Sequence, residues 1–290
     1  MPPSSANTDR ARLRHIYDRL WLASIGSIRA GEIEPDPVLA AGLPDPRRGL
    51  TLIGRPSPAV RRRVETFLRE LRQFEPEQYY YASSEFHLTV LPLFTATARP
   101  DPFFARTKRY VAAVDSIMRR AAPIHLEFAG VTVSSDAVLI QGFFENQALN
   151  ELRDALRRQI RSDWLAESLD GRYRLETAHM TVVRFRARLR DAERFAGALD
   201  EARHRVFGET DVRSLRLVKN DWYMTRSVLE TVKRYRLCSI PATRDTRPRP
   251  ASPRDVEARA KNLWQLSSRP ATKDVPAGND ALMRSALRRR

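Results

Sequence analysis

The pattern of apolar and polar residues between Gly49 and Leu237 predicts alternating strands and helices. The apolar run Leu50–Gly54 is typical of a strand, whereas apolar residues three or four positions apart after Pro58 indicate a helix with one buried face. The predicted strands cover residues 50–54, 86–94, 124–133, 137–144, 179–185, 212–219 and 227–237. The predicted helices cover residues 57–71, 104–120, 146–161 and 191–206. Gly130 predicts a bend in the third strand.

The order strand–helix–strand–helix–strand occurs twice, over residues 49–133 and again over residues 137–237. Because the two stretches share few residues, the repeat depends on element order, spacing and one short motif. We therefore expect one domain over residues 49–238 that is built from two repeats.

The flanking segments differ from this domain. Residues 1–14 predict a loose lead-in, and the helical spacing of apolar residues from 15 to 37 predicts a helix ended by Pro35 and Pro37. Residues 239–290 hold 6 of the 19 prolines, twelve basic and five acidic residues, and few apolar ones. Such a composition buries too little apolar area to offset the entropy of ordering, so we expect a mostly disordered basic tail.

Composition narrows the class of protein. The 290 residues are 42% hydrophobic and 30% charged, as expected for a soluble globular chain with some polar tail. No apolar run approaches the roughly 18 residues that a membrane span needs, and the N-terminus has no signal-peptide core. The lone Cys238 excludes an intramolecular disulfide and a cysteine-rich metal site. We expect a cytoplasmic protein without membrane contact, and a monomer.

The charge balance points to an anionic partner. Lys and Arg number 51 against 35 Asp and Glu, a net charge of +16. Long-range attraction favours RNA or a nucleotide as the partner, with the basic tail able to contact nucleic acid. A solvated arginine-rich surface is the equally simple alternative.

One motif occurs at the same place in both repeats. His87-Leu88-Thr89-Val90 begins a predicted strand of the first repeat, and His179-Met180-Thr181-Val182 begins the matching strand of the second, 92 residues later. Since side chains alternate along a strand, each strand presents an imidazole and a hydroxyl on one face. One such motif would be a coincidence, but two among five histidines, at equivalent positions, indicate function.

Paired His-x-Thr-apolar motifs in a duplicated chain resemble those of the 2H phosphoesterase superfamily, which includes RNA 2′,3′-cyclic phosphodiesterases and 2′-5′ RNA ligase-like proteins. The resemblance covers roughly residues 49–237 and does not identify a subfamily. It implies an α+β fold of two lobes, with antiparallel sheets, helices outside and a pseudo-two-fold axis through a central cleft.

The chemistry of the four side chains agrees with this resemblance. Opening a cyclic phosphodiester needs one group that takes a proton and one that supplies it, and imidazoles serve near neutral pH. We expect His87 and His179 to be catalytic, and Thr89 and Thr181 to donate hydrogen bonds to the phosphate. Because His-x-Thr is a poor chelate, we expect neither a metal nor another cofactor.

Weaker candidates and other functions remain open. Arg184 could neutralise a phosphate, although strand alternation places it on the opposite face unless a bulge intervenes. Tyr79–Tyr81 and Trp222-Tyr223 could stack on a base or simply pack. The leading interpretation is hydrolysis of a 2′,3′-cyclic phosphate or a 2′-5′-linked nucleotide. The reverse ligation, a non-catalytic RNA-binding module and a hydrolase of a small cyclic-phosphate metabolite are the alternatives.

Overall fold

The computed structural model describes residues 5–144, 146–170 and 174–238. The predicted tail, 239–290, lies outside the described residues. The helices are α1 (Ser5–Arg29), α2 (Pro37–Ala40), α3 (Pro58–Phe74), α4 (Asp101–Phe104), α5 (Thr107–Met118), α6 (Ala148–Ser162) and α7 (Ala192–Glu201). The strands are β1 (Arg48–Gly54), β2 (Tyr79–Tyr80), β3 (Leu88–Thr97), β4 (Ile124–Ser134), β5 (Ala137–Phe143), β6 (Met180–Arg184), β7 (Val206–Val212), β8 (Ser214–Asn220) and β9 (Glu230–Arg236).

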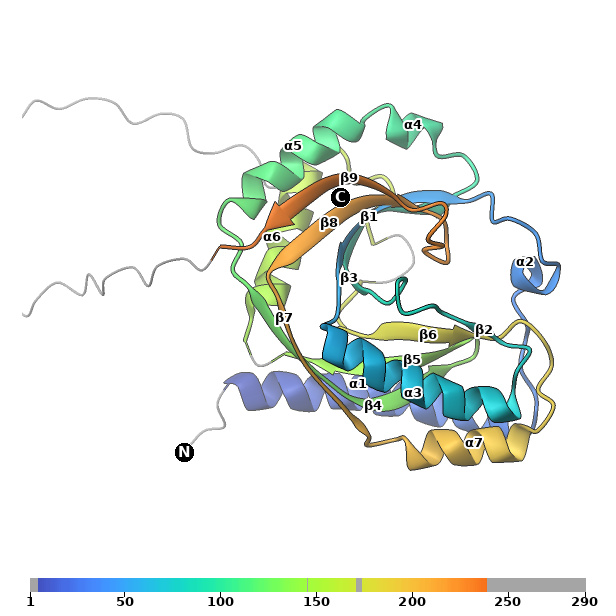
Figure 1. The fold of residues 1–290 in the computed structure, drawn as a ribbon. Coiled ribbons are helices and arrows are strands. Elements are labelled where there is room, and N and C mark those ends of the chain that lie inside the picture. Colours follow the sequence, from blue (N-terminus) through green and yellow to red (C-terminus); the bar gives the residue numbers. More distant parts are fainter. Residues whose placement is uncertain (1–4, 145, 171–173, 239–290) are drawn as a thin grey trace, which may run out of the picture. The chain divides into compact units, whose positions relative to one another are not determined.

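The strands form two antiparallel sheets. The smaller has the order β3-β1-β8-β9 and the larger the order β2-β6-β5-β4-β7. The smaller sheet curls above the larger one in Figure 1. Each sheet takes strands from both halves of the chain, because β8 pairs with β1 and β4 pairs with β5. The predicted α+β class with antiparallel sheets and a duplicated arrangement is confirmed.

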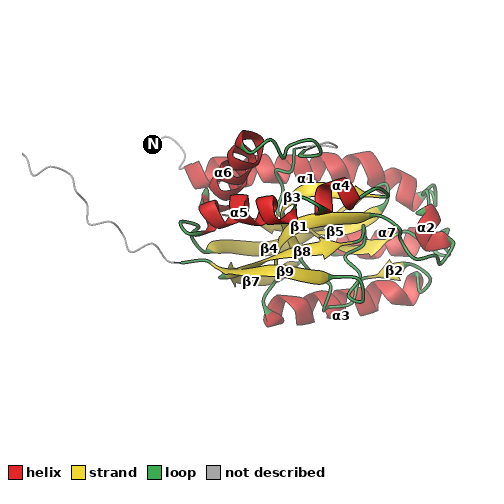
Figure 2. Cartoon of the chain, turned by 90° about the horizontal axis from the view of Figure 1, so that it is seen from above, coloured by secondary structure: helices red, strands yellow, loops and turns green. Residues whose placement is uncertain are grey.

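Helices flank the strands, as a view from above shows (Figure 2). Helix α1 packs on β4 and β5, α3 on β7, and α5 and α6 pack together beside β9 and β3. The apolar stripe predicted for α3 is its buried face, formed by Val60, Val64, Phe67, Leu68 and Leu71. The cap of α3 is Ser57, whose hydroxyl accepts a hydrogen bond from the Val60 amide. Pattern and packing therefore agree for this helix.

The loose lead-in expected over residues 1–14 is wrong from Ser5 onward, because α1 begins there. Leu13, Tyr17, Trp21 and Ile28 are buried in the main core at helical spacing, so packing against the larger sheet continues the helix toward the N-terminus. None of the helices in the described part of the chain is long and apolar enough to cross a membrane.

The predicted helix over 191–206 is too long, and β7 was not predicted. Helix α7 ends at Glu201, and after a turn the chain forms β7, which begins at Val206 and pairs with β4. The alternation in β7 is weak because Gly208 interrupts it, with a positive φ of 109° beside a register shift. Gly130 also has a positive φ, 87°, next to a shift in the pairing of β4 with β5, as expected for the predicted bend.

Candidate active site

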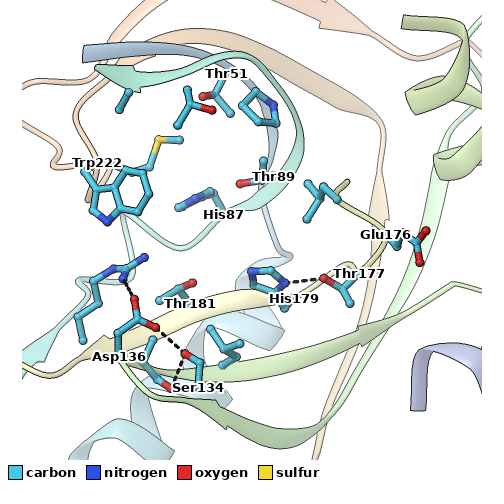
Figure 3. A pocket seen from close by; sticks show the side chains of 18 of the residues that line it. Thr51, His87, Thr89, Ser134, Asp136, Glu176, Thr177, His179, Thr181 and Trp222 are labelled. Carbon is cyan, nitrogen blue, oxygen red and sulfur yellow. Dashed lines mark hydrogen bonds and ion pairs between the residues drawn. The ribbon is translucent and has the colours of Figure 1, made fainter. Parts of the chain in front are cut away.

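Both motifs line one pocket of about 660 Å³. His87 lies immediately before β3 and Thr89 lies on it, while His179 lies immediately before β6 and Thr181 lies on it. The two pairs approach the same space from opposite sides (Figure 3). The four residues singled out in the sequence are therefore together in the structure, although 92 residues separate the histidines.

A β-bulge interrupts each motif strand at the same position. In the pairing of β3 with β1, Thr89 and Leu91 have partners and Val90 is skipped. In the pairing of β6 with β5, Thr181 and Val183 have partners and Val182 is skipped. A bulge inserts one residue into the alternation, so the residues after it change face.

This shift brings Arg184 into the pocket. Simple alternation places Arg184 on the face opposite to His179, and the bulge at Val182 reverses that placement. The equivalent position of β3 is Pro92, which also lines the pocket, so only the second motif brings a cation. The sequence signal for the bulge is a pair of adjacent apolar residues, Val182 and Val183, both of which are buried.

Arg184 is held by two neighbours, one in the turn between β4 and β5 and one directly after β2. Its Nη1 donates to Asp136 at 2.8 Å, and its Nε donates to the Tyr81 hydroxyl at 3.2 Å. Burial alone would lower the pKa of Arg184, but Tyr81 and Asp136 hold this pKa above its ordinary value. Asp136 also accepts a hydrogen bond from Ser134 at 2.7 Å. The pocket thus contains a fixed, permanently charged guanidinium.

Each histidine uses Nδ1 for a hydrogen bond within the protein. The His87 Nδ1 lies 2.7 Å from the Glu85 carbonyl, and the His179 Nδ1 lies 2.7 Å from the Thr177 hydroxyl. A carbonyl only accepts, so His87 carries its proton on Nδ1 and its Nε2 accepts when the ring is neutral. A hydroxyl donates or accepts, so His179 can adopt either tautomer.

Burial lowers the pKa of both histidines to about 4. At His87, the Glu85 carbonyl partly opposes this effect, while the charges of Arg55 and Arg184 add to it. At His179, Arg153, His87 and Arg184 lower the pKa further, and Asp136 raises it. Both rings are therefore neutral at pH 7 without an anion, and a bound phosphate would raise both pKa values by neutralising the surrounding positive charge.

An aromatic wall closes one side of the pocket. Tyr81 and Trp222 line it, and the guanidinium carbons of Arg47 and Arg184 lie 4.7 and 5.8 Å from the centre of the Trp222 ring. Tyr223 is buried and donates to Asp36 at 2.6 Å. Of the aromatic residues that the sequence suggests for stacking on a base, Tyr81 and Trp222 line the pocket.

Two further observations concern metal binding and the cysteine. Within the described ranges, no three His, Cys, Asp or Glu side chains converge as ligands of a metal ion. Cys238 is exposed at the last described position, and it is not among the residues that line the pocket.

Comparison with known proteins adds a family and several similar folds. Residues 56–222 match the model of the 2′-5′ RNA ligase superfamily. The protein TT0787 of Thermus thermophilus is 17% identical, with a TM-score of 0.48 over 67% of this chain and 99% of that one. LigT of E. coli in complex with 3′-AMP is 14% identical, with a TM-score of 0.42 over 67% and 99%. A conserved protein of unknown function from Agrobacterium tumefaciens is 12% identical, with a TM-score of 0.46 over 72% and 97%. No curated protein matches this chain significantly.

Proposed function

The chain belongs to the 2′-5′ RNA ligase superfamily, and from this premise we propose that it is a metal-independent phosphoesterase. Its substrate would be a 2′,3′-cyclic phosphate or a 2′-5′-linked nucleotide. The observation that carries the proposal is the convergence of both His-x-Thr pairs and Arg184 on one pocket. A site that only binds a phosphate would need the Arg184 guanidinium and the threonine hydroxyls. It would not need two proton-transfer groups on opposite walls.

The proposed reaction places the phosphate between the two motif strands. Water attacks phosphorus, one histidine accepts a proton from that water, and the bond from phosphorus to one ribose oxygen breaks. The other histidine gives its proton to the departing oxygen, so a cyclic phosphate becomes a phosphomonoester. Thr89 and Thr181 donate to the non-bridging oxygens, and Arg184 balances the charge that develops on them.

We assign the acid to His87 and the base to His179. The Glu85 carbonyl accepts the Nδ1 proton of His87, and this bond strengthens when the ring is charged. At His179, the positive charge of Arg153 opposes protonation. Arg55 acts on His87 in the same sense, and burial lowers both pKa values to about 4. The assignment therefore rests on the carbonyl acceptor at His87, in place of which His179 has a hydroxyl that can also donate.

The pocket also favours a nucleotide over a bare phosphate. Its volume of about 660 Å³ lies within the usual range of small-molecule sites. The half-buried Trp222 offers an aromatic surface on the wall beside Arg184, where a base could stack, and the buried Tyr81 supports this wall. A nucleotide would thus use both the polar motif strands and the aromatic wall, whereas a free phosphate would use only the first.

A substrate panel tests the proposal. The purified full-length chain is assayed with 2′,3′-cyclic mononucleotides, 2′-5′ dinucleotides, ADP-ribose cyclic phosphate and RNA that ends in a cyclic phosphate, with and without excess EDTA. We expect turnover of at least one nucleotide substrate, unaffected by EDTA and lost in His87→Ala and His179→Ala. Binding of RNA without turnover would favour the non-catalytic module, and turnover of the metabolite alone would favour the small-molecule hydrolase.

A further inference from the structure

Arg153 lies on α6, behind the pocket rather than in its lining. Its side chain is fully buried, with an exposed fraction of 0%. The chemistry proposed above gives it no contact with the substrate. The sequence offers no reason to single it out either, since it is one of several arginines on an amphipathic helix.

The guanidinium of Arg153 binds backbone carbonyls from both motifs. Toward the first motif, its Nε donates to Val90 at 2.8 Å and its Nη2 to Thr89 at 2.9 Å. Toward the second motif, its Nη1 donates to Glu176 at 3.1 Å and its Nη2 to Thr177 at 2.8 Å. One planar group thus joins the strand that presents His87 to the segment that ends at His179.

The positions of these carbonyls explain why they need a donor from outside the sheets. Val90 is skipped in the pairing of β3 with β1, and the residues before β6 lie outside any strand, so part of this backbone lacks sheet partners. A buried carbonyl without a donor costs about 1–3 kcal/mol. A guanidinium has five N–H groups in a fixed plane, whereas a lysine has three on a flexible stem and cannot make the same four contacts.

The connection reaches the second histidine through a single residue. The Thr177 carbonyl binds Arg153, and the hydroxyl of the same residue binds the Nδ1 of His179 at 2.7 Å. Tyr17 of α1 supports the same segment, because its hydroxyl accepts a hydrogen bond from the Ala178 amide at 3.2 Å. The ring of His179 is therefore oriented by a segment that Arg153 fixes to the first motif.

We propose that Arg153 is a positioning residue that sets the separation and orientation of the two histidines by binding the backbone of both motifs. The expected effect of Arg153 on kcat rests on the proposed function. The geometric consequence, the relative placement of the two imidazoles, does not depend on activity.

Two substitutions in the full-length protein separate geometry from charge. Arg153→Lys keeps the positive charge but cannot make all four hydrogen bonds, whereas Arg153→Met loses both the charge and the hydrogen bonds. Arg157→Lys is the matched control: Arg157 is 3% exposed on the same helix, but it binds Asp154, Asp170 and the Leu175 carbonyl, all in the second repeat. Each variant is measured for kcat, KM, thermal stability and the titration of both histidines by NMR.

We expect Arg153→Lys to lose about 10²-fold in kcat with little change in KM, as for a misplacement of about 1 Å in the reacting groups. We expect Arg153→Met to lose as much kcat and also to raise the pKa of His179, because the neighbouring charge is gone. The control should lose stability and keep its kcat. If Arg153→Met does not fold, Arg153→Lys alone provides the test.

A kcat of Arg153→Lys within about threefold of the wild type, with a loss of stability like that of Arg157→Lys, would show a merely structural role and overturn the proposal. If the wild type hydrolyses none of the substrates, the proposed function fails and Arg153 is tested without turnover. The probe is then inorganic phosphate, which should shift the NMR signals of both imidazoles in the wild type and in the control. An identical response in Arg153→Lys would equally overturn the proposal.

Discussion

Acidification should destabilise this protein through its two pocket histidines. Burial lowers the pKa of His87 and of His179 to about 4, against about 6.5 in an unfolded chain. The unfolded chain therefore binds more protons than the folded one below about pH 6.5. The free energy of unfolding is therefore unaffected by these two groups above that pH, and it decreases as the pH falls from about 6.5 toward 4.

The magnitude follows from the two pKa values. At pH 4.5, each histidine should reduce the free energy of unfolding by about 2–3 kcal/mol relative to pH 7, or roughly 5 kcal/mol for the pair. Because domains of this kind are stable by only about 5–15 kcal/mol, such a loss would bring the protein close to unfolding.

Urea unfolding followed by tryptophan fluorescence at pH 7 and pH 4.5 measures this loss. A variant that carries both His87→Gln and His179→Gln should lose much less stability between the two pH values than the wild type. The exposed His204 supplies the control, since His204→Gln should behave like the wild type. If the double variant and the wild type lose the same free energy on acidification, the pocket does not hold its histidines neutral and the reasoning fails.

Four further predictions concern function. Each of the single changes His87→Ala and His179→Ala should reduce kcat about 10²–10⁴-fold. The double variant should lose less than the product of the two single losses, because the two groups act as a unit. A double variant whose loss equals that product would contradict the paired mechanism. Thr89→Ala should cost less than either histidine change in the same assay, since it removes one phosphate donor and leaves the proton path intact. With a nucleoside 4-nitrophenyl phosphodiester, whose leaving group needs no acid, a His87 variant should regain activity and a His179 variant should not; the opposite result would reverse the assignment of acid and base. Removal of residues 239–290 should leave mononucleotide turnover intact and weaken the binding of long RNA in a salt-dependent manner; loss of folded protein on truncation would contradict this independence.

Local order along the chain was enough to predict most of the elements and the catalytic candidates. The apolar stripe of α3 and the run that forms β1 follow from residues that are neighbours in sequence, and the predicted bounds lie close to the observed ones. The two His-x-Thr motifs were visible because strand alternation couples positions two residues apart. A repeated element order then suggested that they meet.

Non-local pairing decided the features that local patterns could not specify. Arg184 faces the pocket because one residue is skipped in the pairing of β6 with β5. This register depends on the partner strand β5, which lies outside the His-x-Thr motif. The length of α1 depends on the sheet beneath Leu13 and Tyr17, and β7 depends on β4 as its partner. Arg153 is the clearest case: in the sequence it is one charge on a helix, and only the convergence of two bulged or irregular backbone segments makes it the donor of four hydrogen bonds. The reason is physical, since periodicity is a property of adjacent residues whereas hydrogen-bond partners are supplied by whichever segments the fold brings together.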